Sequence, residues 1–197
     1  PIVGCAFRKT YFDPDAQRNC SVYVSALDVV INYWAKSMAS APRISEILRL
    51  YPHEIEEYRR SGHFDRRFDL PMQADNSDKD SLHIFIEQHR RIDLDDDGYA
   101  EPYIVLVHKD TQRVARITAR YDAEGIKLTT DRTTGERIVA RINAIPYYTK
   151  YDFLPNKEGA IYGQGFGQLL RPLNEAANTV LNQIIDAATL ANSGGAS

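Results

Sequence analysis

The spacing of apolar residues changes once along this chain, near Pro155, and this change limits the folds that the chain can adopt. Before Pro155, apolar and polar residues alternate over short segments separated by Gly, Pro, Asp and Asn, as in antiparallel strands joined by turns. After a glycine-rich stretch, residues 168–191 repeat aliphatic side chains every three or four positions, as one amphipathic helix does. The sequence therefore predicts an α+β fold, in which an antiparallel β meander with hairpins precedes one long C-terminal helix.

The strand-like segments cover residues 3–12, 21–24, 28–34, 82–94, 103–107, 114–121, 126–130, 137–143 and 147–153. Residues 44–50 are compatible with a strand or with the approach to a helix. Pro52, early acidic residues and a final Gly62 predict a short helix over 52–61. Residues 65–81 are polar and lack periodicity, so they are predicted to form a loop.

Two of these strands carry predictions about burial. Residues 103–107 are continuously apolar, which is typical of a central strand covered on both faces. In residues 114–121 the alternation predicts that Ala115, Ile117, Ala119 and Tyr121 are buried and that Arg116 and Arg120 face solvent.

The composition excludes several classes of protein. The chain has 197 residues, of which 43% are hydrophobic, so disorder and a disulfide scaffold are excluded. Lys and Arg number 24 against 27 Asp and Glu, a formal charge of −3, which argues against a protein that grips nucleic acid through a basic face. No apolar run is long enough to span a membrane. Because the chain begins at Pro1 without Met, we expect a piece of a longer protein.

Cysteine and histidine spacing bears on compartment and metal binding. Cys5 and Cys20 fall in the first predicted hairpin but not opposite each other, so we expect free thiols and a reducing, intracellular origin. No spacing typical of a zinc site occurs. His89 and His108 lie on strands that we expect to pair, so a two-histidine site stays open.

A run of acidic residues allows a calcium interpretation. Asp93, Asp95 and Asp97, followed by Gly98, match the start of an EF-hand loop. The twelfth position holds Ile104 in place of the bidentate carboxylate, and no helices flank the run. A hairpin turn rich in Asp and Gly is the favoured interpretation. The alternative is a metal-binding domain or an enzyme that uses this cluster.

Other motifs give no active site. Gly163, Gly165 and Gly167 precede the predicted long helix, but the Lys of a phosphate-binding loop and the spacing of a dinucleotide fold are missing. A flexible entry that lets the helix pack closely is favoured. No nucleophile motif occurs, so we expect no cofactor, no catalytic residue and no enzymatic activity.

The predicted long helix has few charges for its length. Between residues 169 and 190 only Arg171, Glu175 and Asp186 are charged, whereas the solvent face of a surface helix usually carries more. Short polar residues recur every four positions opposite the aliphatic stripe. We therefore expect this helix to pack against other chains or segments, or alternatively to be a core helix with satisfied amides. The residues expected at the interface are Leu169, Leu173, Asn174, Asn178, Val180, Leu181, Asn182, Ile184 and Ile185.

Several segments together are similar to one protein family. They are YYTKYDFLP (147–155), YGQGFGQLLRPLNEAANTVLNQIIDAATLAN (162–192), GCAFRKTYFDP (4–14), DVVINY (28–33), PRI (42–44) and YIV (103–105). In this order the chain resembles the portal proteins of tailed double-stranded-DNA bacteriophages, in the branch typical of short-tailed phages. The glycine-then-helix segment is the most specific part of the resemblance.

The resemblance implies a structural, non-catalytic protein of the virion that is assembled in the cytoplasm of the host bacterium. Portal subunits form a homo-oligomeric, dodecameric ring at one capsid vertex. Terminase drives double-stranded DNA through its channel, and tail or adaptor proteins are seated on it. This chain is much shorter than a whole subunit. It would hold a wing-like β-rich domain (1–158), a glycine-rich connector (159–167) and a long packing helix (168–192). A small adaptor module that binds one partner helix is a further alternative.

Overall fold

The computed structural model of the chain describes residues 4–14, 16–70, 81–130, 132, 135–156 and 159–194. These residues fall into two compact units, each treated by itself below. The first unit is Phe7–Lys150 and contains most of the strands. The second combines the residues up to Ala6 with Tyr151–Ser197 and contains the long helix.

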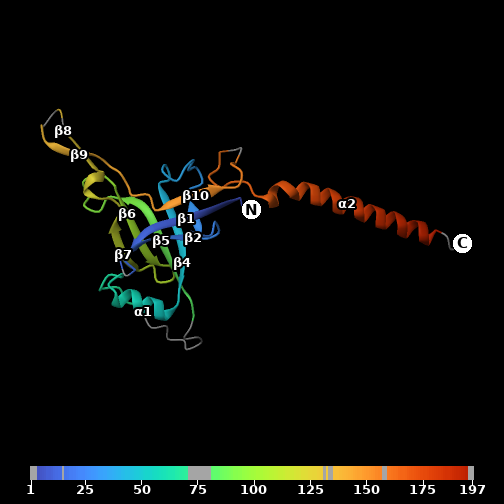
Figure 1. Cartoon of the computed structure of the whole chain (residues 1–197), viewed down its shortest axis with the longest axis horizontal. Helices are drawn as coiled ribbons and strands as arrows, with labels where there is room; N and C mark the ends of the chain where they lie inside the picture. Colours follow the sequence, from blue (N-terminus) through green and yellow to red (C-terminus); the bar gives the residue numbers. More distant parts are fainter. Residues whose placement is uncertain are drawn as a thin grey trace. The chain divides into compact units, whose positions relative to one another are not determined.

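The elements confirm the predicted α+β fold (Figure 1). The strands are β1 (Cys5–Asp13), β2 (Arg18–Val24), β3 (Val29–Ile31), β4 (Arg43–Leu50), β5 (His83–Ile92), β6 (Glu101–His108), β7 (Val114–Ala119), β8 (Ile126–Thr130), β9 (Arg137–Ile142) and β10 (Tyr148–Asp152). The helices are α1 (Pro52–Arg60), the 3₁₀ turn η1 (Ala123–Gly125) and α2 (Phe166–Ser193).

These strands form three sheets. The largest has the order β3-β4-β5-β6-β7 and consists of antiparallel pairs, so it is a meander in which each strand lies beside its neighbours along the chain. A second sheet has the order β10-β1-β2, and β8 pairs with β9 in a two-stranded hairpin. The ambiguous segment 44–50 is thus a strand, and α1 ends one residue before its predicted end.

One predicted strand is much shorter than expected. The β-branched and aromatic residues 28–34 predict a strand of that length, but β3 covers only Val29–Ile31. The chain turns directly after β3, where the Ala35 amide donates to the Asn32 carbonyl oxygen at 3.0 Å. Tyr33 and Trp34 are consequently exposed, with their rings in an edge-to-face contact.

The burial predictions for β6 and β7 hold only in part. No residue of β6 is exposed, as predicted for a central strand. In β7, an edge strand, Ala115 is fully buried as predicted, but Ile117 and Ala119 are exposed, and Tyr121 beyond it is only partly buried. Arg120, which was predicted to face solvent, is only partly exposed, because segments beyond the sheet cover the end of β7.

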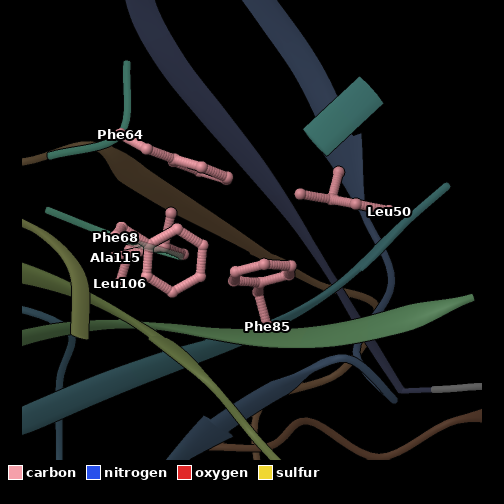
Figure 2. Close-up of a cluster of buried hydrophobic side chains, with 6 residues drawn as sticks. All are labelled: Leu50, Phe64, Phe68, Phe85, Leu106 and Ala115. Carbon is pink, nitrogen blue, oxygen red and sulfur yellow. The ribbon is translucent and has the colours of Figure 1, made fainter. Parts of the chain in front are cut away.

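An aromatic cluster covers one face of the largest sheet (Figure 2). Phe85 in β5 stacks on Phe64 with ring centroids 5.5 Å apart, and Phe64 meets Phe68 edge-to-face at 5.1 Å. Phe64 and Phe68 lie in the segment after α1, and Phe68 falls within the region predicted to be a loop. The first part of that loop is therefore anchored in the core, while residues 71–80 lie outside the described residues. The remaining members of the cluster are Leu50, Leu106 and Ala115.

The second unit contains a close backbone crossing before α2. The Phe153 amide donates to the Gly4 carbonyl oxygen at 2.9 Å, and the Gln164 amide donates to the Leu154 carbonyl oxygen at 2.8 Å. A methyl group built on Gly163 would lie 2.6 Å from the Gly4 oxygen, so only glycine fits at this position.

The long helix begins earlier than the sequence predicts. Pro172 was expected in the first turn, which placed the start near residue 168, but α2 begins at Phe166 with Gly165 as its N-cap. The ring of Phe166 packs on that of Phe153, with centroids 4.5 Å apart, which adds a packing contact at this start. Pro172 then lies inside the helix and leaves the carbonyl of Gln168 without its intrahelical donor.

Candidate functional site

The most chemically distinctive group of side chains is a buried charge network within the unit Phe7–Lys150. Lys9 Nζ lies 2.9 Å from Glu46 Oε2 and 2.7 Å from Glu87 Oε1. The Tyr148 hydroxyl donates to Glu46 Oε2 at 2.6 Å and lies 3.3 Å from Glu87 Oε1. His89 Nε2 is 2.7 Å from the same Glu87 oxygen. We call these five residues the Lys9 network.

The sheet register explains why a lysine is needed here. Glu46 in β4 and Glu87 in β5 are direct cross-strand partners, and like charges in that position repel. Lys9 comes from β1 and Tyr148 from β10, both in the three-stranded sheet. The Lys9 ammonium places one positive charge between the two carboxylates, so it links the two sheets and relieves the repulsion.

Burial and mutual contact fix the protonation states of the network. Burial lowers the pKa of Lys9, but the charges of Glu87 and Glu46 outweigh it and hold the pKa above its usual value. Burial raises the pKa of Glu87, whereas the hydrogen bond from His89 and the charge of Lys9 bring it down to about 2. Burial raises the pKa of Tyr148 most, and the negative charges of Glu87 and Glu46 raise it further. At neutral pH Lys9 is therefore an ammonium, Tyr148 a phenol and Glu87 a carboxylate, in hydrogen-bonded contact.

His89 is neutral at this pH because burial lowers its pKa more than the contact with Glu87 raises it. Its Nε2 must carry the proton, because Glu87 is an ionised acceptor. Nδ1 is buried and has no hydrogen-bond partner among the described residues. The rings of Tyr147 and Tyr148 cover the imidazole edge-to-face, with centroid distances of 5.4 and 4.9 Å.

This arrangement favours a structural contact between sheets over a catalytic centre. A nucleophilic lysine or a general base must lose its proton near neutral pH, and the raised pKa values of Lys9 and Tyr148 oppose this loss. Within the Lys9 network, the basic atom without a partner among the described residues is His89 Nδ1, but His89 is 1% exposed, so a substrate cannot reach it.

The residues predicted to form an interface all lie on α2. No residue of α2 is buried, and the six aliphatic ones are between 41% and 68% exposed. Asn174, Asn178 and Asn182 are exposed as well. The structure thus presents a continuous aliphatic face on a helix of 28 residues.

The acidic run forms the connection between β5 and β6. One carboxylate oxygen from each of Asp93, Asp95 and Asp97 lies within 4.8 Å of the others. The Gly98 amide donates to Asp93 Oδ2 at 2.9 Å, and the Tyr99 amide donates to Asp97 Oδ1 at 2.7 Å, so two carboxylates stabilise the turn itself. The position of the twelfth EF-hand ligand, Ile104, is in the middle of β6, with no flanking helix. The geometry is that of a hairpin turn.

The two-histidine site is not formed. His89 is opposite Ile104 in the sheet, whereas His108 is opposite Phe85, so the two imidazoles are separated along the strands. His108 instead lies 3.3 Å from a ring nitrogen of His83. The prediction that the two cysteines are not bridged is confirmed: neither Cys5 nor Cys20 forms a disulfide, and Cys20 is opposite Tyr11 in the sheet.

Sequence reasoning missed the Lys9 network because polar strand residues are usually assigned to the solvent face. One signal was available: Glu87 and His89 share strand parity with Phe85, and a phenylalanine side chain is usually buried. No protein-family model matches this sequence, and no curated protein matches it significantly. Within the described ranges, the structure has no helix with the length and apolar content needed to cross a membrane.

Proposed function

We propose that this protein is a structural, non-catalytic subunit of the portal ring of a tailed double-stranded-DNA phage. In this role it is built into the virion at one capsid vertex, after assembly in the host cytoplasm. The observation that carries the proposal is the exposed aliphatic face of α2, which has little charge around it. Large exposed apolar surfaces mark sites of association. In this proposal, further copies of the chain cover the aliphatic face of α2.

The charge balance supports the same role. A channel that lets DNA slide must not neutralise many phosphates, because each neutralised phosphate adds affinity for the duplex. The formal charge of −3 satisfies this condition. Head-to-tail contacts between identical subunits close into a ring, which capsid, terminase and tail or adaptor proteins can then contact.

Burial of the α2 face would contribute a useful free energy of association. Full burial of an aliphatic side chain contributes about 1.5–3 kcal/mol, and these side chains are about half exposed, so each adds about 1 kcal/mol. Six such residues give about 6 kcal/mol for each helix. This amount is enough to drive self-association when both partners contribute surface.

The test is sedimentation velocity on the protein and on charged variants of α2. We expect a large assembly for the parent chain, and smaller species for Leu181→Lys and Ile184→Lys, because each variant would bury an ammonium at the interface. Gln183→Lys is the matched control, since it adds the same charge to α2 outside both stripes. A parent chain that stays monomeric at micromolar concentration contradicts the proposal. A one-to-one complex with a single partner helix would favour the adaptor alternative.

A further inference from the structure

A cavity of about 540 Å³ in the unit Phe7–Lys150 is lined by three arginines, Arg91, Arg120 and Arg141. Arg91 belongs to the end of β5, Arg120 follows β7 and Arg141 lies in β9. Residues 38–42, 44, 142–144 and 146–148 complete the wall, with apolar groups such as Met38 and Ile44. No aspartate or glutamate is among the described residues that line this cavity.

The positions of two arginines are fixed by hydrogen bonds that do not neutralise them. Arg91 donates from its two terminal nitrogens to the carbonyl oxygens of Ala100 at 3.2 Å and Ile142 at 3.0 Å. The Arg120 amide donates to the Pro102 carbonyl oxygen at 2.9 Å, and the Ile145 amide donates to the Arg120 carbonyl oxygen at 2.8 Å. These neutral acceptors orient the side chain of Arg91 and the backbone of Arg120, but supply no negative charge.

The guanidinium of Arg120 has no counter-charge among the residues that the structure describes. Its Nε is buried with no hydrogen-bond partner in the described part of the chain, and none of the three arginines forms an ion pair with a described carboxylate. Burial lowers the pKa of Arg120 most, and the positive charge of Arg91 lowers it further. The neutral His89 and Tyr148 of the Lys9 network, and the neighbouring Tyr147, do not supply the missing charge.

We infer that this cavity binds a small anion that carries phosphate groups. Guanidinium groups present paired N–H donors that match phosphate oxygens, and three of them suit a ligand with more than one negative charge. The volume lies in the range of small-molecule pockets, and the apolar wall provides a surface for an organic part. The concave shape favours a small ligand over a DNA duplex, whose phosphates lie on a wide convex surface. This inference is independent of ring formation, because one chain supplies all the lining residues.

The experiment is isothermal titration calorimetry of the whole chain with sodium pyrophosphate. We expect saturable binding at one site that weakens as NaCl is raised, because salt screens the attraction. Arg120→Gln and Arg141→Gln should each weaken the affinity about tenfold or more. Arg137→Gln, on the same strand as Arg141 but outside the cavity, is the matched control and should leave the affinity unchanged.

A second measurement separates ligand binding from a structural role of Arg120. Without ligand, Arg120→Gln should melt at the same temperature as the parent or higher, because it removes the repulsion from Arg91. A structural arginine would instead lower the melting temperature when replaced. The inference is overturned if pyrophosphate gives no saturable heat up to about 10 mM, or if Arg120→Gln and Arg141→Gln both bind as the parent does. A short DNA duplex that binds through the same arginines while pyrophosphate does not would overturn the assignment of a small ligand.

Discussion

Replacement of Lys9 by methionine tests the buried charge network most sharply. Lys9→Met keeps a long, unbranched side chain of similar volume and removes the cation that, among the described residues, contacts both Glu46 and Glu87. The two carboxylates are then buried opposite each other, with side chains 9% and 15% exposed, and without a counter-charge. We expect a large loss of stability at pH 7.

The magnitude follows from the pKa of Glu87. Its fall from 4.5 to about 2 corresponds to about 3 kcal/mol of stabilisation of the ionised form. His89 provides part of this stabilisation, but Lys9 also neutralises Glu46, so about 3 kcal/mol is a fair expectation for Lys9→Met. This value lies at the lower end of the ~3–5 kcal/mol found when one partner of a buried ion pair is removed.

The pH dependence of this loss is specific to the network. In the parent, the contribution of Glu87 is complete above pH 4.5 and is lost as the pH falls towards the folded pKa of about 2. In Lys9→Met the carboxylates protonate more readily and then need no cation. The stability difference between variant and parent should therefore shrink when the pH is lowered from 7 to about 4.

The assay is urea unfolding followed by circular dichroism, because Trp34 is exposed and reports little on the fold. Lys109→Met, at an exposed turn, is the matched control and should change the free energy of unfolding by less than about 0.5 kcal/mol. If Lys9→Met costs no more than this control, or costs the same amount at both pH values, the reasoning about the network is refuted.

Three further predictions concern other parts of the molecule. Gly163→Ala should lower the free energy of unfolding by about 1–3 kcal/mol, because the new methyl group would overlap the Leu154 carbonyl; unchanged thermal melting would contradict this. Below pH 6.5 the free energy of unfolding should fall, because the histidine of the unfolded chain takes up a proton that buried His89 in the folded chain does not. His89→Gln should reduce the slope of the free energy of unfolding against pH in urea titrations, and an equal slope would contradict this prediction. Calorimetric titration with calcium should give no saturable heat, since the Asp turn lacks an EF-hand ligand set; heat that vanishes when Asp95→Asn and Asp97→Asn are combined would favour the metal-binding alternative.

The α+β fold was predictable because the spacing of apolar residues changes where the chain passes from the last strands to α2. The meander 103–121 and the hairpin of β8 and β9 follow directly from short alternating segments and turn residues. The length of β3 was not predictable, because local propensity does not show how much of the neighbouring strand is available for pairing.

The charge network and the arginine cavity depend on contacts between distant segments. Glu46 and Glu87 meet only in one register of β4 and β5, and Lys9 reaches them from another sheet. The alternation of residues along β7 assigned Arg120 to the solvent face. This rule holds for a sheet with one open face, but it fails here because residues 142–148 cover the end of β7. Sequence alternation describes one strand, whereas burial depends on everything packed against it.

In the proposed portal subunit, α2 is covered by other copies of this chain in a closed ring. Electron microscopy of the purified protein tests this cover, because class averages distinguish rings from single subunits without reference to any partner. We expect ring-shaped particles with a central opening, in which the exposed aliphatic face of α2 lies between subunits. A uniform population of particles of about 22.4 kDa at micromolar concentration would contradict it.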